Sequence, residues 1–259
     1  MTIKELHNIL FADTNPVYYD IGARKRIETQ WLRLAKQGLV NAYGFEPDLI
    51  EHKRLSQSTV VTYLPHALGN YCGTSDFYIT KNRGCCSCKK PNFDLLDQYP
   101  YTKGNFNIVN QTKVDIVTLN SLIQKNILPP ADFIKIDVQG LEYEVIEGCD
   151  QYLDNIKGIK FETHFQPMYK GEKTFSEIYD YLTDKGFMLR QLNNIAYYDG
   201  DQLEWDAFFT RPIGPNLSYL YDMFFSKMYN LEPPKLAALC RQHQYTDTPD
   251  KQFYNQYPW

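Results

Sequence analysis

The chain lacks any apolar run long enough to cross a membrane and any long run of lysines and arginines. A membrane-spanning helix needs about 20 consecutive apolar residues, and no stretch of the chain approaches that length. The first residues do not follow the basic, apolar and small-residue order of a secretory signal. A formal net charge of −4 without a basic patch argues against a nucleic-acid partner. We therefore expect a cytoplasmic protein that neither inserts into membranes nor binds nucleic acid.

Cysteine is also scarce, with six residues in a chain of 259. Six are too few for a disulfide scaffold, and thiols stay reduced in the cytoplasm. Cys85 and Cys88 have the spacing of half a zinc site. No second pair of cysteines or histidines follows at the spacing that structural zinc requires, so we do not expect a metal there.

The hydrophobic residues, 43% of the chain, lie in short runs that alternate between the periods of strands and helices. Strands are expected at 17–23, 41–46 and 59–63, with helices between them and a lead-in helix at 2–12. Strands that alternate with helices through short connections form a parallel sheet with crossover helices. The first part of the chain therefore predicts an α/β domain.

The pattern changes at residues 71–119, which we interpret as an inserted region of short strands and loops over the active site. The α/β pattern then resumes. The elements expected in this part are a helix at 121–128, a strand at 133–138, a helix at 141–148, a strand at 158–165, a helix at 175–185 and an antiparallel pair of strands at 187–192 and 206–211.

The sequence pattern predicts a separate tail at the end of the chain. Residues 1–212 are predicted to form the main domain and residues 213–259 an aromatic-rich helical tail, with helices at 217–229 and 234–243. Such a tail packs on its own domain or on a second copy of the chain, so a homodimer through the tail is possible.

An acidic residue stands at or near the end of three of the expected strands. These residues are Asp20, Glu46 and Asp137, and Asp137 stands shortly before the start of a helix. In an open α/β sheet, ligands bind in the crevice formed by the carboxyl ends of the strands and the following helix starts. The simplest alternative is that Asp137 only caps the next helix. The acids at the other two strand ends favour a binding site.

Two kinds of cofactor fit such a crevice, a dinucleotide or S-adenosylmethionine. In either case Glu46 would accept hydrogen bonds from ribose hydroxyls. A dinucleotide needs a Gly-x-Gly-x-x-Gly turn for its pyrophosphate, but the turn after Asp20 has one glycine, Gly22, and then the bulky basic residues 24–26. S-adenosylmethionine has no phosphate, its ammonium and sulfonium suit Asp20, and its carboxylate suits Arg24 or the helix N-terminus. The residues therefore favour the methyl donor over a dehydrogenase cofactor.

Four motifs resemble the FkbM family of S-adenosylmethionine-dependent methyltransferases. They are Tyr-Asp-Ile-Gly-Ala-Arg at 19–24, Gly-Phe-Glu-Pro-Asp at 44–48, Ala-Leu-Gly-Asn at 67–70 and Asp-Phe-Ile-Lys-Ile-Asp-Val-Gln-Gly-Leu-Glu at 132–142. The loop at 84–92 and the segment at 162–169 resemble the branch of the family whose first motif reads Asp-Ile-Gly-Ala-Arg. The resemblance covers roughly residues 15–212. Lys25-Arg26-Ile27 departs from it, because this branch commonly has glycines there.

The resemblance implies a class I methyltransferase fold, with a Rossmann-like sheet that is mostly parallel and ends in an antiparallel strand. It also implies O-methylation of a hydroxyl on a sugar, polysaccharide or glycosylated metabolite. In such a site Asp20, Gly22 and Ala23 would line the methionine end of S-adenosylmethionine, and Glu46, beside Pro47, would hold the ribose. Ala67 and Leu68 would flank the adenine, and Asp137 would lie nearest the methyl group.

Methyl transfer needs a group that takes the hydroxyl proton as the new bond forms. His164 is a candidate base, since an unperturbed pKa of about 6.5 leaves it mostly neutral at cellular pH. Asp137 is the alternative, either as the base or as the residue that orients the hydroxyl. Glu162 stands two residues before His164 on the same strand face, where it could set the tautomer of the imidazole.

A divalent metal held by Asp137, Glu162 and His164 would acidify the hydroxyl. The sequence offers no tight ligand spacing for it, and we do not favour a metal. The residues expected to contact the acceptor, a glycan or another small molecule, are Ser87, Gln139 and Glu142. The rival hypothesis is a non-catalytic protein that uses the methyltransferase fold for binding or assembly in a glycan pathway. The Lys25-Arg26 turn and the tail favour this rival, whereas the acids at the strand ends favour the enzyme.

Overall fold

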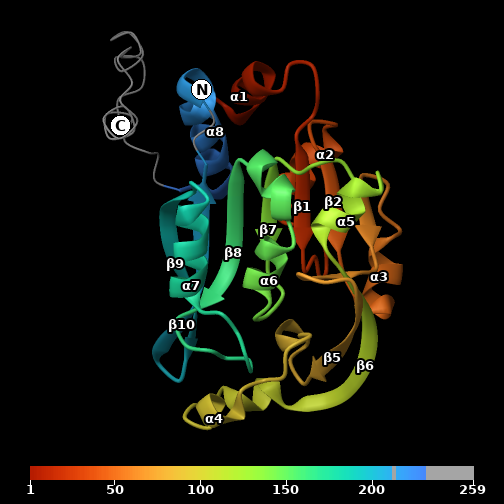
Figure 1. Cartoon of the computed structure of the whole chain (residues 1–259), viewed down its shortest axis with the longest axis vertical. Helices are drawn as coiled ribbons and strands as arrows, with labels where there is room; N and C mark the ends of the chain where they lie inside the picture. The colour runs from red at the N-terminus through yellow and green to blue at the C-terminus, as the bar shows by residue number, and fades with distance from the viewer. Residues whose placement is uncertain (212–213, 232–259) are drawn as a thin grey trace.

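Seven strands form the main sheet, in the order β3-β2-β1-β7-β8-β10-β9. The computed structural model describes residues 1–211 and 214–231 (Figure 1). Strands β3, β2, β1, β7 and β8 are mutually parallel, and β10 is antiparallel to both β8 and β9. The strands span Val17–Ile21 (β1), Asn41–Phe45 (β2), Val61–Leu64 (β3), Phe133–Ile136 (β7), Gly158–His164 (β8), Met188–Tyr198 (β9) and Asp201–Thr210 (β10). This order confirms the predicted α/β class I methyltransferase fold.

Helices cover both faces of the main sheet. The first face carries α1 (Ile3–Leu10), α2 (Thr29–Lys36) and α8 (Gly214–Tyr229), and the second carries α5 (Leu119–Gln124), α6 (Glu142–Glu147) and α7 (Phe175–Asp184). Neighbouring residues of β1 serve opposite faces, because side chains alternate along a strand. Tyr18 therefore stacks on Trp31 of α2 at 4.1 Å, whereas Tyr19 belongs to the core under α5 and α6.

Helix α8 packs on the main sheet of its own domain. Phe224 and Phe225 are fully buried and contact Phe133 of β7, and Trp31 donates a hydrogen bond from Nε1 to the hydroxyl of Tyr229 (2.9 Å). The first half of the predicted tail is thus part of the domain core. The helix predicted at 234–243 lies outside the described residues, and the homodimer stays a prediction.

A second, smaller sheet has the order β4-β6-β5. Its strands span Ala67–Leu68 (β4), Gly73–Thr80 (β5) and Ile108–Val117 (β6), and the segment between β5 and β6 holds α4 (Phe93–Leu96) and the 3-10 turns η1 (Arg83–Cys85) and η2 (Lys103–Phe106). In Figure 1 this region lies below the main sheet, on the side toward which β8 points. It therefore lies at the carboxyl ends of the parallel strands, where the ligand crevice was expected.

The last two strands are longer than predicted. They form one hairpin with its turn at Asp199-Gly200, where both residues have positive φ, 51° and 107°. Asp-Gly is a favoured sequence for such a two-residue turn. Asn193 and Asn194 obscured this signal, since asparagine is rare in strands. The helix predicted at 121–128 is also displaced and spans Leu119–Gln124.

Helix α3 (Leu49–Leu55) follows β2 and packs beside β3. None of the helices in the described ranges combines the length and the apolar character needed to span a bilayer.

Replacing Phe224 by alanine is expected to lower the free energy of unfolding by about 3–5 kcal/mol. The side chain is fully buried against Phe11, Trp31 and Phe133, so the substitution leaves a cavity between α8 and the sheet. Urea denaturation measures the loss. Ile50→Ala is the control, because Ile50 is 80% exposed and its loss should change stability by less than about 0.5 kcal/mol. Equal effects of the two substitutions would contradict the packing of α8.

Candidate active site

A crevice opens at the carboxyl ends of β1, β2 and β7, between the main sheet and the β4-β6-β5 region. It brings together most of the residues predicted to bind the cofactor. Those that line it are Gly22, Arg24, Glu46, Pro47, Ala67, Leu68 and Asp137. Gln139 and His66 also line it. Asp20 does not face this crevice but lines an adjoining cavity with Arg24, Lys135 and Asp137. Ala23 is 1% exposed and belongs to the core under α2, so it does not line the crevice.

Gly22 makes the turn between β1 and α2 possible. Its φ is +82°, and a Cβ atom on it would lie 1.8 Å from the backbone oxygen of Asp137. No side chain fits at that distance, so the two strand ends approach as closely as their backbones permit. The backbone N–H of Asp137 donates to Ile21 O (2.9 Å) at the same place. The fold therefore requires a glycine at this position of the first motif, because any side chain would collide with the backbone of Asp137.

Lys135 is buried between the ends of β1 and β7. Its Nζ lies 3.1 Å from Asp20 Oδ1 and 3.3 Å from Asp137 Oδ2, and it donates to Gly22 O (3.2 Å). Burial favours the neutral amine, but the carboxylates of Asp137 and Asp20 outweigh it and raise the pKa of Lys135 above its ordinary value. Asp20 thus acts on the crevice through Lys135. The sequence analysis did not predict Lys135 as a site residue, although a charged residue inside a buried apolar strand indicates a carboxylate partner.

Glu46 stands at the end of β2 and is 5% exposed. Its Oε1 accepts a hydrogen bond from the backbone N–H of Asp48 (2.8 Å). Burial raises the pKa of Glu46 to about 7, against the backbone hydrogen bond and the charge of Arg24, which lower it. The carboxyl group is therefore held in the position predicted for a ribose contact, and its charge state changes near neutral pH.

Asp137 is the most accessible acid of the crevice, with 35% of its side chain exposed. Burial opposes its ionisation, but Lys135, the Gln139 amide and Lys160 outweigh this and lower the pKa of Asp137. The residue is an ionised carboxylate at neutral pH. It does not cap the next helix, whose N-cap residue is Leu141; its two oxygens instead contact Lys135 and Gln139.

Gln139 connects Asp137 to the strand β8. Its backbone has a φ of +61°, which is rare for a residue with a side chain. Its Nε2 donates to Asp137 Oδ1 (3.1 Å) and to Glu162, and its Oε1 accepts from the hydroxyl of Tyr169 (2.7 Å). These three contacts fix the orientation of the amide. Ser87 holds the backbone, donating from Oγ to Gln139 O (2.6 Å).

Two residues predicted to contact the acceptor have structural contacts instead. Ser87 is 1% exposed, and its hydroxyl donates to the Gln139 carbonyl. Glu142 is 2% exposed, and its carboxylate accepts from the backbone N–H groups of Val138 (3.0 Å) and Gly140 (2.9 Å). It therefore fixes the turn that leads into α6. Of the three predicted acceptor residues, Gln139 alone lines the crevice.

His164 is not the neutral base that the sequence suggested. Its Nδ1 lies 2.6 Å from Glu172 Oε1. Burial favours the neutral ring, but Glu172, with smaller contributions from Glu204 and Glu142, outweighs it and raises the pKa of His164 to about 9. Glu172 also replaces Glu162 as the residue that orients the imidazole. It stands in the loop after β8, where no sequence pattern pointed to it.

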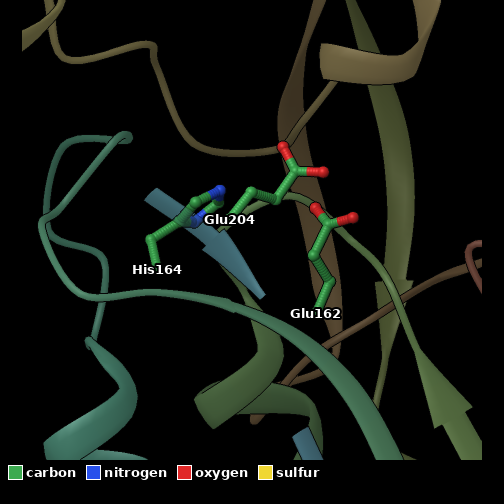
Figure 2. Close-up of side chains that lie close together, drawn as sticks. All are labelled: Glu162, His164 and Glu204. Atoms are coloured by element: carbon green, nitrogen blue, oxygen red, sulfur yellow. The ribbon is translucent and has the colours of Figure 1, made fainter. Parts of the chain in front are cut away.

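Glu162, His164 and Glu204 extend from β8 and β10 toward the same space (Figure 2). One ring nitrogen of His164 and one carboxylate oxygen of each glutamate all lie within 4.8 Å of one another. Glu162 and His164 are buried, and Glu204 is partly exposed. The sequence analysis predicted that Glu162 and His164 lie together but did not predict Glu204. Glu204 follows His164 by 40 residues and stands on the antiparallel strand β10.

The strand order gives the chain the fold of the class I methyltransferases, with a crevice at the carboxyl ends of its parallel strands. The sequence profile of the methyltransferase FkbM domain matches residues 20–189, more than half of the chain. The chain belongs to this family, and the predicted enzyme class and the S-adenosylmethionine cofactor are confirmed. No curated protein sequence shows a significant match.

Solved methyltransferase structures show weak overall similarity. Magnesium protoporphyrin IX methyltransferase from Synechocystis PCC 6803, with bound S-adenosylmethionine, is 13% identical with a TM-score of 0.39, over 81% of this chain and 77% of that one. The plantazolicin methyltransferase BpumL is 12% identical with a TM-score of 0.39, over 80% and 81%. A putative tRNA (m1A22) methyltransferase from Streptococcus pneumoniae is 10% identical with a TM-score of 0.37, over 93% and 86%. These values support no inference about the acceptor.

Gly22→Ala is expected to abolish stabilisation by S-adenosylmethionine, because the new Cβ meets the Asp137 carbonyl at the crevice. Gly38→Ala is the matched control, since Gly38 also has positive φ (+70°) but nothing within 4 Å of an added Cβ. It should cost about 1 kcal/mol of stability and keep the response to the cofactor. Thermal unfolding with and without S-adenosylmethionine measures both effects. The same response in the two variants would contradict the close approach.

Glu46→Gln is expected to stabilise the cofactor-free protein more at pH 8 than at pH 5. The folded-state pKa of about 7 lies above the ordinary value of 4.5, so the ionised carboxylate costs folding free energy as the pH rises through this interval. The gain of the variant over the native chain should grow by about 2 kcal/mol between the two pH values. Urea denaturation at each pH measures it. A gain that does not change with pH would contradict the raised pKa.

Proposed function

We propose that the protein transfers the methyl group of S-adenosylmethionine to a hydroxyl of a sugar, a polysaccharide or a glycosylated metabolite. The observation that carries this proposal is a group of acidic side chains that begins with Asp137 in the crevice and continues through Gln139 to the buried Glu162 and the partly exposed Glu204. An accessible carboxylate such as Asp137 accepts hydrogen bonds from hydroxyl groups and repels phosphates. These side chains therefore favour a neutral acceptor rich in hydroxyl groups over nucleic acid.

The residues that line the crevice match the parts of the cofactor in order. Glu46 would accept hydrogen bonds from the ribose, and Ala67 and Leu68 would form the apolar seat of the adenine. Arg24 offers a positive charge for the carboxylate of the cofactor, and Asp137 offers a negative charge for its ammonium or sulfonium group. The cofactor supplies the reactive methyl group, and the protein supplies alignment.

In the reaction the acceptor oxygen forms a bond to the methyl carbon while the carbon–sulfur bond breaks, which leaves a neutral thioether. The hydroxyl proton becomes strongly acidic as the new bond forms, so a weakly basic carboxylate can take it. We assign this role to Asp137, which is ionised, accessible and hydrogen-bonded to Gln139. Gln139 holds Asp137 in place and so acts as a positioning residue.

The cytoplasm is the compartment we propose for this reaction. The described cysteines all carry free thiols, which suits a reducing compartment. They are Cys72, Cys85, Cys86, Cys88 and Cys149.

The second candidate function is a binding or assembly role without catalysis. Lys25 and Arg26 stand where the related branch has glycines, and they line the cavity that adjoins Asp20. Their side chains occupy space next to the methionine end of the proposed cofactor site. This candidate predicts that the chain binds glycans without forming S-adenosylhomocysteine.

Asp137→Asn is expected to lower kcat about 100-fold, because it removes the group that takes the proton but keeps its shape. The assay measures S-adenosylhomocysteine released with a panel of neutral oligosaccharides, a peptide and an RNA as acceptors. Asp184→Asn, on the exposed end of α7, is the control and should keep the native rate. Turnover with the RNA or the peptide but no oligosaccharide would overturn the proposed acceptor class. Glycan binding without any turnover would favour the non-catalytic candidate.

A further inference from the structure

We propose that Glu162, His164 and Glu204 bind one divalent transition-metal ion such as Mn²⁺ or Zn²⁺ (Figure 2). The sequence reading considered a metal on Asp137, Glu162 and His164. The structure instead joins Glu204 to the latter two, while Asp137 contacts Lys135. Metal binding at this cluster does not depend on the identity of the acceptor. A role of the ion in methyl transfer rests on the proposed function.

The donor atoms already lie at nearly the required separation. A ring nitrogen of His164 and one oxygen of each glutamate lie within 4.8 Å of one another. Nitrogen and oxygen ligands stand about 2.0–2.2 Å from zinc, so two ligands of one ion are at most about 4.4 Å apart. Small rotations of the glutamate side chains therefore close the site. No movement of the backbone is needed.

His164 has one ring nitrogen available for an ion. Its Nδ1 contacts Glu172, whereas Nε2 is buried and has no hydrogen-bond partner in the described part of the protein. The side chain as a whole is 1% exposed. A buried polar atom without a partner is costly, and a metal ion at Nε2 would remove that cost.

The strand geometry places all three side chains on one face of the sheet. Glu162 and His164 are two residues apart on β8, and Glu204 stands directly opposite His164 in the register of β10. Two hydrogen-bonded strands form a rigid support for a metal site. Because Glu204 is partly exposed, an ion can reach the cluster from its side.

Each of the three side chains is held by a second residue. Glu172 contacts His164 through Oε1 and accepts from the backbone N–H of Tyr169 (3.0 Å) through Oε2. This is the carboxylate–histidine–metal arrangement that fixes the imidazole in metal sites. The Tyr198 hydroxyl donates to Glu204 Oε2 (2.5 Å), and Gln139 donates to Glu162. Each glutamate keeps a second oxygen for the ion.

The charge of the cluster also calls for a cation. Among the described residues, no lysine or arginine forms an ion pair with Glu162, Glu172 or Glu204, although the nearby Lys160 pairs with Glu28 and Asp206. Buried carboxylates are costly unless they are paired or bind a metal. A divalent ion bound at the cluster would place a positive charge next to these carboxyl groups.

The donor set selects the kind of ion. One imidazole and two carboxylates suit Mn²⁺ and Zn²⁺, whereas Mg²⁺ prefers oxygen ligands alone. Three protein ligands leave coordination positions open for an exogenous oxygen. Gln139 links Glu162 to Asp137, so this open side lies next to the residue assigned to the hydroxyl proton. An acceptor hydroxyl is the ligand we propose for it.

The test uses the full chain, freed of metal with a chelator and titrated with MnCl₂, and with ZnCl₂ in a parallel arm. Loss of the free Mn²⁺ electron paramagnetic resonance signal and calorimetry report the binding. We expect one ion per chain. Glu204→Gln and Glu172→Gln should each weaken binding by about 10- to 100-fold, the first by removing a ligand and the second by releasing the imidazole. Glu147→Gln, on an exposed glutamate at the end of α6, should leave binding unchanged.

Absence of stoichiometric binding of both ions, or native affinity in Glu204→Gln, would overturn the proposal. If a variant does not fold, the anomalous diffraction signal of Mn²⁺ in crystals of the native chain decides, because it must lie between Glu162, His164 and Glu204. Titration of the same metal-free protein with S-adenosylmethionine separates the two proposals. If the chain binds S-adenosylmethionine and turns over without binding a metal, the metal-site proposal is overturned and the proposed methyltransferase function stands.

Discussion

The buried ammonium group of Lys135 joins the two strand ends between which the cofactor crevice opens. Lys135 stands opposite Asp20 in the register of β1 and β7. Its ammonium group contacts Asp20 and also Asp137, which follows two residues later in the chain. A buried charge that loses its partners is strongly destabilising. The three charges therefore constrain one another, and the contact of Gly22 with Asp137 depends on the same alignment. The position of Asp137, from which the site is built, follows from this constraint.

From Asp137 the site continues along a chain of hydrogen bonds. Gln139 donates hydrogen bonds to both Asp137 and Glu162, and so links the crevice to β8. Ser87 of the inserted region and Tyr169 of the loop after β8 hold Gln139 in place. The side chains beside Asp137 are thus fixed by contacts from outside the crevice. The proposed transfer of a methyl group to a hydroxyl requires such prior organisation.

The sequence was sufficient for the part of the site that lies at strand ends. The alternation of strands and helices predicted the parallel sheet, and the motifs at 19–24 and 44–48 predicted Gly22 and Glu46 at the crevice. A local sequence pattern is enough to predict these residues, because each one stands directly after the strand that positions it. The same reasoning predicted Asp137 at a strand end, and Asp137 lines the crevice.

The remaining residues of the site depend on tertiary contacts that no local pattern contains. Glu204 meets His164 only through the register of the β8–β10 pair, and Glu172 reaches the imidazole from an irregular loop. Ser87 and Glu142 were misjudged because a polar residue near a site can serve the backbone as well as a ligand. Lys135 could have been found, since a lysine between the apolar residues of a buried strand requires an acidic neighbour.

The central claim is that the crevice of Gly22, Glu46 and Asp137 binds S-adenosylmethionine. Calorimetric titration of the purified chain with S-adenosylmethionine, with NAD as the control ligand, tests it most directly. We expect one S-adenosylmethionine site per chain, no binding of NAD, and loss of S-adenosylmethionine binding in Glu46→Ala. Absence of S-adenosylmethionine binding, or binding that is unaffected by Glu46→Ala, would contradict it.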